Sequence, residues 1–403
     1  MTKILIVALF CLMPVCLLAQ TPVDTTNIVD IDTTGQKDLI DIARTIFKFK
    51  PRINNREKKA VYFSILPISS AVPGGSKALV TSTTAGFYLG PRKTTYLSSV
   101  GFAPYFNLSG DYGLPIHSSI WLNNNTYNIQ GDTRFLVFPQ NTWGLGGGQG
   151  ENDRILVRYN YIRLYQSALK RITPYLYAGI GYNMDYYINI HTDNQVTLAN
   201  FTGYQVGTSE GNNSFTSGLT LNFLYDTRQN SFNPIPGSFA NLIYRQNTAV
   251  LGSDNNTKSL YIDLRKYISL TSKIAKNQFA FWAYYWTTIG GGTPYLNLPS
   301  IGNDPYQRSG RGIEQNRYRG QSLIYFETEY RRDITRNGLL GFVVFANVNS
   351  ASQPNGRNFA YLNPAGGTGL RIKFNKNSDT NICLDYGLSK GYSDFSVSLG
   401  EAF

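Results

Sequence analysis

The chain has 403 residues, of which 42% are apolar and 15% charged, so it can bury a core and lacks the composition of a disordered protein. Tyr (29), Phe (23) and Gly (38) are abundant, which favours strands and turns and argues against a helical bundle. Beyond the N-terminus no run of about 18 apolar residues occurs, which excludes a membrane protein built of helices. The formal net charge of +12 comes without a nucleic-acid-binding motif, so we attribute it to membrane-surface and lumen electrostatics and expect no nucleic-acid partner.

The first 19 residues have the pattern of a cleavable secretory signal, with Lys3 ahead of an apolar stretch. Cys11 and Cys16 lie inside this segment, and neither follows the small residue that a lipidation site needs. We expect an exported mature chain that begins at Gln20 and keeps only Cys383, so that no internal disulfide forms.

Residues 20–59 are predicted to form an N-terminal extension with one short helix. Leu39, Ile42 and Ile46 recur at helical spacing within 38–49 and predict an amphipathic helix. We expect it to rest on the domain that follows. A position on the membrane surface or in a pore is the alternative.

From residue 60 to residue 403 the chain reads as strands separated by Gly, Pro, Asn and Asp clusters. Sixteen strands are predicted, at 60–66, 78–89, 95–106, 114–122, 126–138, 155–169, 175–190, 215–225, 238–245, 259–269, 278–289, 322–332, 339–349, 367–374, 381–387 and 395–403. Many have one apolar and one polar face. Leu219, Leu221 and Phe223, for example, alternate with small or polar residues.

The last strand shows the same alternation, since Phe395, Val397, Leu399 and Phe403 share one face. With a secretory signal, this pattern is typical of a transmembrane barrel. The predicted fold is therefore all-β, a 16-stranded antiparallel transmembrane β-barrel over 60–403. An even strand number closes the sheet without an edge, and sixteen strands leave a lumen that wall side chains cannot fill.

Two further stretches suggest functional positions. Asp226 and Arg228 precede Pro234 and Gly237 in a turn, where Pro and Gly close the turn and the charged pair can form at the rim. The segment 290–320 is longer than a loop that only connects two strands, so we expect it to have a structural or functional role.

That long segment contains Arg311-Gly312, and the strand after it places Glu327 and Glu329 on one face, opposite apolar residues. The next strand offers Asn347. A guanidinium away from bulk water needs paired acceptors, and carboxylates or an Asn carbonyl can act as such acceptors. An exposed Arg311 is the alternative.

These stretches, together with the terminal Phe403, resemble the BamA/TamA superfamily of outer-membrane assembly barrels, also called bacterial surface antigens, over about residues 61–403. The resemblance implies that the long loop folds into the lumen and docks its Arg-Gly tip on acidic wall residues. On this resemblance we expect Glu329 to carry the charge pairing with Arg311, and Asn347 to accept a hydrogen bond. It also implies that the terminal strand is an address for barrel insertion. The 40 residues at 20–59 are too few for the periplasmic POTRA domains that precede the family's barrels, so we expect a member without them.

Enzymatic functions find little support. The Gly-x-Ser-x-Gly match at 207–211 lacks the following helix, and the chain has only two histidines as partners. The Gly-rich segment 144–150 lacks the Lys-Ser/Thr of a phosphate loop. We expect no catalytic residue, no metal and no cofactor.

The leading hypothesis is insertion or translocation of outer-membrane proteins or components, through a seam where the first and last strands meet. Gly391 and Gly400 would weaken that seam. The first alternative is a passive channel that favours anions, because Arg371 and Lys373 face the lumen. The second is an accessory subunit of an outer-membrane complex. Expected partners are outer-membrane lipid and lipopolysaccharide, with client proteins or complex subunits.

Overall fold

The computed structural model describes residues 35–48, 61–71, 77–108, 110–193, 196–228, 230, 233–234, 236–270, 276–305, 307–354, 357–376 and 378–403. The predicted signal segment 1–19 and much of the extension 20–59 lie outside these residues. The helices and strands run in the order α2 (Leu39–Ile46), β1 (Val61–Ala71), β2 (Lys77–Phe87), β3 (Ser98–Phe102), β4 (Tyr105–Phe106), β5 (Tyr112–Trp121), η2 (Asn123–Asn125), β6 (Tyr127–Thr142), β7 (Ile155–Thr173), β8 (Leu176–Thr192), α3 (Leu198–Thr202), β9 (Asn212–Asp226), β10 (Gly237–Asn247), η3 (Ala249–Leu251), β11 (Thr257–Ser269), β12 (Asn277–Ile289), η4 (Tyr295–Asn297), β13 (Ser322–Asp333), β14 (Leu340–Ala351), β15 (Asn363–Asn375), β16 (Thr380–Ser389) and β17 (Tyr392–Leu399).

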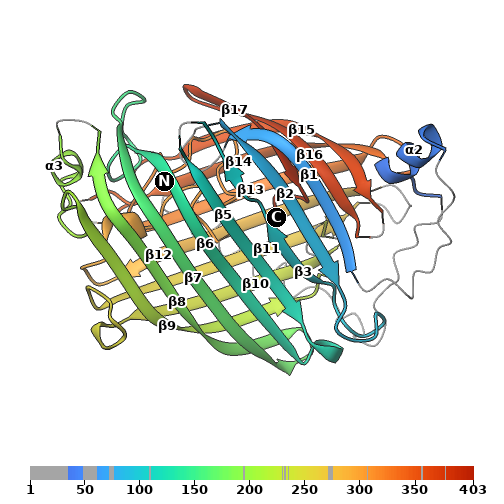
Figure 1. Ribbon diagram of the computed structural model, residues 1–403, viewed down its shortest axis with the longest axis horizontal. Helices are drawn as coiled ribbons and strands as arrows, with labels where there is room; N and C mark the ends of the chain where they lie inside the picture. The colour runs from blue at the N-terminus through green and yellow to red at the C-terminus, as the bar shows by residue number, and fades with distance from the viewer. Residues whose placement is uncertain are drawn as a thin grey trace.

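The strands form one antiparallel barrel, in which each strand other than β3 pairs with the next along the chain (Figure 1). β3 and β4 both lie between β2 and β5 and together fill one position, so the described strands occupy sixteen positions. The predicted all-β, 16-stranded barrel with a short N-terminal helix is confirmed.

The break between β3 and β4 has a local cause. Pro104 stands between them, and proline has no N–H to contribute to the ladder. Its carbonyl still accepts a hydrogen bond from the N–H of Thr81, at 3.0 Å, so the strand stays in place despite the break.

Side-chain polarity is reversed relative to a water-soluble protein. On β9, the predicted apolar face lies outside, with Leu219, Leu221 and Phe223 at 59%, 51% and 50% exposure. The alternate residues Thr220 and Asn222 are buried on the inner face. An apolar exterior around a polar interior is the pattern of a transmembrane barrel.

Short turns and long loops gather at opposite ends of the barrel. The turns 334–339 and 376–379 lie at one end, called here the turn end, and the loops 143–154, 193–211 and 290–321 lie at the other, called the loop end. Because neighbouring strands run antiparallel, successive connections alternate between the two ends of the barrel. β1 begins and β17 ends at the turn end.

α2 is shorter than the predicted 38–49 and is attached to the turn end (Figure 1). Asp38 caps it, and Asp38 and Asp41 form a reciprocal capping box. The N–H of Lys37 donates to the carbonyl of Asn337, at 3.1 Å, in the β13–β14 turn. None of the described helices is long and apolar enough to span a membrane.

The barrel has an unusual seam between its first and last strands. β1 pairs with β2 over its whole length, and β17 pairs with β16 from Tyr392 to Leu399. β17 also approaches β1 and β2, but within the described residues no ladder joins β17 to β1. One edge of each strand is therefore left without a strand partner.

The predicted last strand, 395–403, is wrong at its end. β17 stops at Leu399, where Gly400 takes a φ of 82°, a conformation that glycine adopts without strain. Phe395 is 58% exposed on the outer face, Val397 follows the same alternation, and Leu399 is buried. Phe403 leaves this row and lies 3% exposed in the barrel interior.

Candidate functional site: the inward loop and the lumen wall

The loop between β12 and β13 enters the lumen and contacts facing parts of its wall. On β6, Arg134 Nη2 donates to the carbonyl of Pro305 at 2.7 Å, and Asn141 Nδ2 donates to Glu314 Oε1 at 2.8 Å. Further along, Arg311 reaches β13 and β16. The loop is therefore a structural part of the interior, as the fold prediction requires.

The part of this loop nearest the loop end packs into an apolar cluster. Tyr295, Leu296 and Leu298 are buried against wall residues that include Tyr159 and Tyr187. Arg319 Nη1 donates to the carbonyl of Tyr295 at 2.9 Å, and its guanidinium lies 4.8 Å from the centre of the Tyr295 ring. This packing fills the lumen below the loop end.

The tip of the loop is a tight turn from Gly310 to Ile313, closed by a 2.8 Å hydrogen bond from the N–H of Ile313 to the carbonyl of Gly310. Gly310 and Gly312 have φ values of 79° and 81°, which glycine tolerates best. A Cβ on Gly312 would lie 2.6 Å from the backbone nitrogen of Leu388. Only glycine therefore lets the tip reach β16.

Arg311 binds three carboxylates. Its Nε donates to Glu327 Oε1 and its Nη1 to Asp385 Oδ2, both at 2.9 Å, while Nη2 contacts Glu327 and Glu329. Its guanidinium also lies 3.8 Å from the centre of the Phe345 ring. Charged, planar hydrogen bonding of this kind is strong and direction-specific. The loop tip is thus held on β13, β14 and β16.

These contacts keep Arg311 charged. Burial alone would lower the pKa of its guanidinium, but Glu327, Glu329 and Asp385 together raise that pKa well above its ordinary value. Ion pairs continue on either side, because Arg331 binds Glu329. On the other side Arg371 binds Asp385 and Glu401. Three guanidinium groups and four carboxylates form one network along the wall.

The structure places the predicted docking residues together, with two differences. Asn347 donates from Nδ2 to the carbonyl of Arg311 at 3.0 Å, where the sequence predicts that it accepts from the guanidinium. The third carboxylate belongs to Asp385, which the sequence reasoning missed. The alternation of Asn381, Cys383 and Asp385 with apolar residues on β16 is the signal that could have found it.

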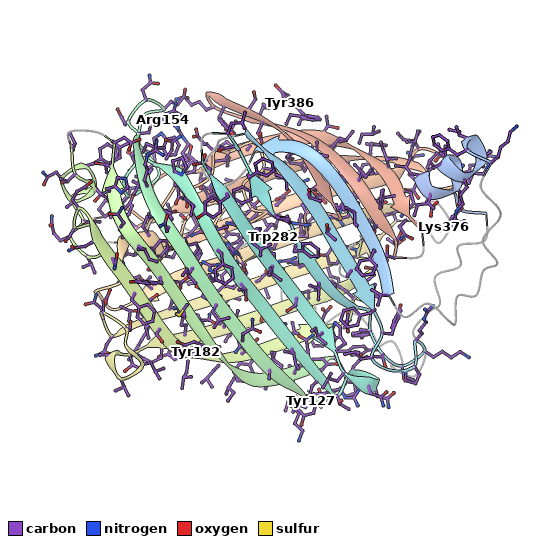
Figure 2. The ribbon with its side chains drawn as sticks, viewed as in Figure 1. Tyr127, Arg154, Tyr182, Trp282, Lys376 and Tyr386 are labelled. Carbon is purple, nitrogen blue, oxygen red and sulfur yellow. The ribbon has the colours of Figure 1, made fainter. Side chains whose placement is uncertain are left out.

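The segment after β17 is held inside the lumen by several strands. The carbonyl of Phe403 accepts from Arg331 Nη2 at 3.0 Å, and its ring lies 5.2 Å from Trp282, centre to centre (Figure 2 labels Trp282). Asn381 Nδ2 donates to Glu401 Oε1 at 2.8 Å. Residues 400–403 are called here the tail.

The inward loop also holds this tail. Arg308 donates to the carbonyls of Glu401 and Leu399, the latter at 3.4 Å. Arg308 borders two cavities of about 330 and 430 Å³, both of which reach Leu399 and Ala402. The loop therefore contacts the wall through Arg311 and the end of the last strand through Arg308.

The predicted rim pair forms at the turn end. Arg228 Nε and Nη2 donate to the two carboxylate oxygens of Asp226, each at 2.9 Å, and the guanidinium lies 4.0 Å from the centre of the Phe239 ring. Gln278 Nε2 donates to the carbonyl of Pro234 at 3.1 Å. Gly237 begins β10 close to Thr227. Phe232, in the same turn, lies outside the described residues.

The two cations that suggested an anion-favouring lumen are both paired with carboxylates. Arg371 binds Asp385 and Glu401, and Lys373 binds Asp379. In the part of the chain that the structure describes, no group of three or more His, Cys, Asp or Glu is placed to hold a metal ion.

A second buried network crosses the opposite wall. Asp185 accepts from Arg245 Nη1 at 2.7 Å and from Arg163 Nε at 3.2 Å. Arg163 also reaches Asp132, which Arg134 binds through two 2.7 Å hydrogen bonds. Arg134 in turn holds the loop at Pro305, so both networks support the same loop.

Three known structures share the fold of this barrel. BamA from Haemophilus ducreyi lacking POTRA domains 1–3 is similar with a TM-score of 0.53 and 12% identity, over 93% of this chain and 81% of that chain. CdiB from Escherichia coli gives a TM-score of 0.54 and 10% identity, over 85% of this chain and 62% of that chain. CdiB from Acinetobacter baumannii gives 0.51 and 12%, over 84% and 65%.

These identities show the fold alone, and this chain spans less than two thirds of the length of either CdiB chain. No curated protein matches the chain significantly. The Omp85 superfamily domain matches residues 121–403, which is more than half of the sequence. The chain therefore belongs to the Omp85 superfamily.

Proposed function

We propose that this protein is an outer-membrane barrel that takes part in the insertion or translocation of outer-membrane proteins or components through the seam between β1 and β17. Its mechanism is physical and uses no catalytic group. The free edges of β1 and β17 present backbone N–H and C=O groups that an incoming strand can pair with. Outer-membrane phospholipid and lipopolysaccharide surround the apolar exterior.

The observation that carries this proposal is the seam itself. Within the described residues β17 makes no ladder with β1, while the tail that would extend β17 is bound inside the lumen by Arg308 and Arg331. A strand end that is held inward leaves the neighbouring edge of β1 free. The membership in the Omp85 superfamily supports the same function.

The test is the folding rate of an unrelated outer-membrane protein into liposomes that contain or lack this barrel. We expect faster folding with the barrel, and loss of the acceleration in Arg311→Ala. Arg154→Ala is the matched control, because Arg154 forms a 3.3 Å pair with Glu314 but is 50% exposed. Folding at the rate of empty liposomes would contradict the proposal.

The same reconstituted protein distinguishes the two other functions. A steady, anion-selective conductance without accelerated folding would identify a channel. The pairing of Arg371 and Lys373 with carboxylates makes this outcome unexpected, since it neutralises the cations that would select anions. Stable co-purification with other outer-membrane subunits, again without acceleration, would identify an accessory subunit.

A further inference from the structure

The helix α2 is fixed to the barrel by its first turn. Asp38 Oδ2 accepts from the backbone N–H of Lys376 at 2.9 Å, and Lys376 Nζ donates to Asp41 Oδ2 at 2.6 Å. The N–H of Lys37 donates to the carbonyl of Asn337. Figure 2 shows Lys376 where the barrel meets the helix. α2 therefore has a set position beside the β13–β14 and β15–β16 turns.

The body of the helix has two chemically distinct sides. At 100° per residue, Leu39, Ile42, Ala43 and Ile46 fall on one side. No residue of the helix is buried, and Ile46 is 68% exposed. The docking contacts thus use the polar first turn, and on the apolar side they leave Ala43 and Ile46 exposed, with Leu39 and Ile42 half-buried.

The barrel surface beside α2 is apolar as well. Ile334, in the turn to which Lys37 is bound, is 59% exposed. Val344 on β14 and Leu370 on β15 are 50% and 38% exposed. β14 begins after the turn that binds Lys37, and β15 ends before the turn that binds Asp38. The apolar outer surface of the barrel therefore reaches the end at which α2 is attached.

The charges around α2 are mostly positive. Lys37, Lys48, Arg332 and Arg336 are exposed, and none of them makes an ion pair within the described residues. Arg44 lies on the polar side of the helix. Cations around an apolar helix face match the phosphate groups and acyl chains of a lipid surface.

We infer that α2 lies in the membrane interface, with its apolar side in the phospholipid leaflet at the turn end of the barrel. Interfacial helices bury the apolar face about 5–10 Å into the headgroup and acyl boundary. The helix then adds a lipid contact at the turn end, beside the turn between β15 and β16, and β16 is the strand that pairs with β17 at the seam.

The inference is tested with environment-sensitive fluorophores on the barrel in phospholipid nanodiscs. Ile46→Cys and Thr45→Cys are labelled separately in a protein whose three natural cysteines are replaced by serine. Thr45 is the matched control, because it is exposed and lies on the polar side of the same helix. The quenchers are lipids that carry a nitroxide on the acyl chain, and heat-modifiable gel migration checks the folding of both variants.

We expect a blue-shifted emission at position 46 and quenching at least about twofold stronger there than at position 45. Equal emission and equal quenching at the two positions would overturn the inference. A blue shift at position 46 without quenching by the lipid nitroxides would also overturn it, because the helix would then be covered by protein, either another segment or a second copy. Neither result depends on whether the barrel accelerates folding of a client.

Discussion

Gly312 in the inward loop and Gly387 on β16 pack backbone to backbone. A Cβ on Gly312 would lie 2.6 Å from the nitrogen of Leu388, and a Cβ on Gly387 would lie 2.6 Å from the nitrogen of Gly312. Separations below 3.0 Å force atoms to move. The loop tip is therefore fixed by shape as well as by the ion pairs of Arg311, and the two contributions can be tested separately.

A series of glycine substitutions isolates the contribution of shape. Gly387→Ala adds a clash without a positive φ and should cost about 1–3 kcal/mol, because overpacked sites must shift. Gly290→Ala adds strain alone, since Gly290 has a φ of 83° and open space, and should cost about 1–2 kcal/mol. Gly312→Ala combines both effects.

Gly291→Ala is the neutral control for this series, because Gly291 has open space and no positive φ. Protease sensitivity of 290–320 and the free energy of unfolding in detergent are the measurements. We expect cleavage to rise for Gly387→Ala and Gly312→Ala and to stay unchanged for Gly291→Ala. Equal cleavage of all four variants would mean that the contact does not hold the loop.

Replacing Arg311 tests the electrostatic contribution. Arg311→Ala leaves Glu327 buried without a cation, while Glu329 keeps its pair with Arg331, and loss of one partner of a buried pair costs about 3–5 kcal/mol. Arg311→Lys should be intermediate, since a point charge cannot reproduce the planar pairing with Asp385. Urea unfolding in detergent measures both effects.

The control for Arg311 removes the unpaired charge as well. Combining Arg311→Ala with Glu327→Gln should recover part of the lost stability, because Glu327 is the carboxylate that loses its cation. Glu329 stays in place in this variant, since it pairs with Arg331. If the double variant is as unstable as the single one, the cost lies in packing against Phe345 and the charge argument fails.

The sequence predicts most of the barrel wall, because side-chain polarity along each strand alternates with a period of two residues. The apolar row of Leu219, Leu221 and Phe223 lies outside as predicted, and its polar neighbours lie inside. The interruption at Pro104 follows from a residue that cannot donate a hydrogen bond, but it divides a predicted strand that the alternation treats as continuous.

The interior is less predictable because it depends on pairs that are far apart in the chain. Arg311 and Asp385 are separated by 74 residues, and no local pattern joins them. Phe403 keeps the alternation of the last strand, yet Gly400 turns the chain inward before it. Its new partners Tyr267 and Trp282 come from other strands. The alternation along a strand determines on which face of the sheet a side chain lies. The contacts across the lumen depend in addition on strand register and on the course of the loops.

Arg308 should control the position of the tail. Arg308→Met removes the donor to Leu399 and Glu401, and a hydrogen bond to a charged group contributes about 1.5–3 kcal/mol. The reaction of Ala402→Cys with a soluble thiol reagent should then accelerate about tenfold or more. The natural cysteines are replaced by serine, and Arg154→Met serves as the control. An unchanged rate in Arg308→Met would show that other contacts hold the tail.

The second network predicts that losing a buried carboxylate costs more stability than losing an exposed one. Asp185 has no exposed side-chain area and binds Arg163 and Arg245, whereas Asp193 is 39% exposed and binds Arg158 at 2.7 Å. Asp185→Asn should lower the free energy of unfolding by about 3–5 kcal/mol, since it leaves two guanidinium groups underpaired in the interior. Asp193→Asn should change it by less than about 1 kcal/mol, because water already screens that pair. Similar losses for the two variants would mean that the lumen around Asp185 is as well hydrated as the outer surface.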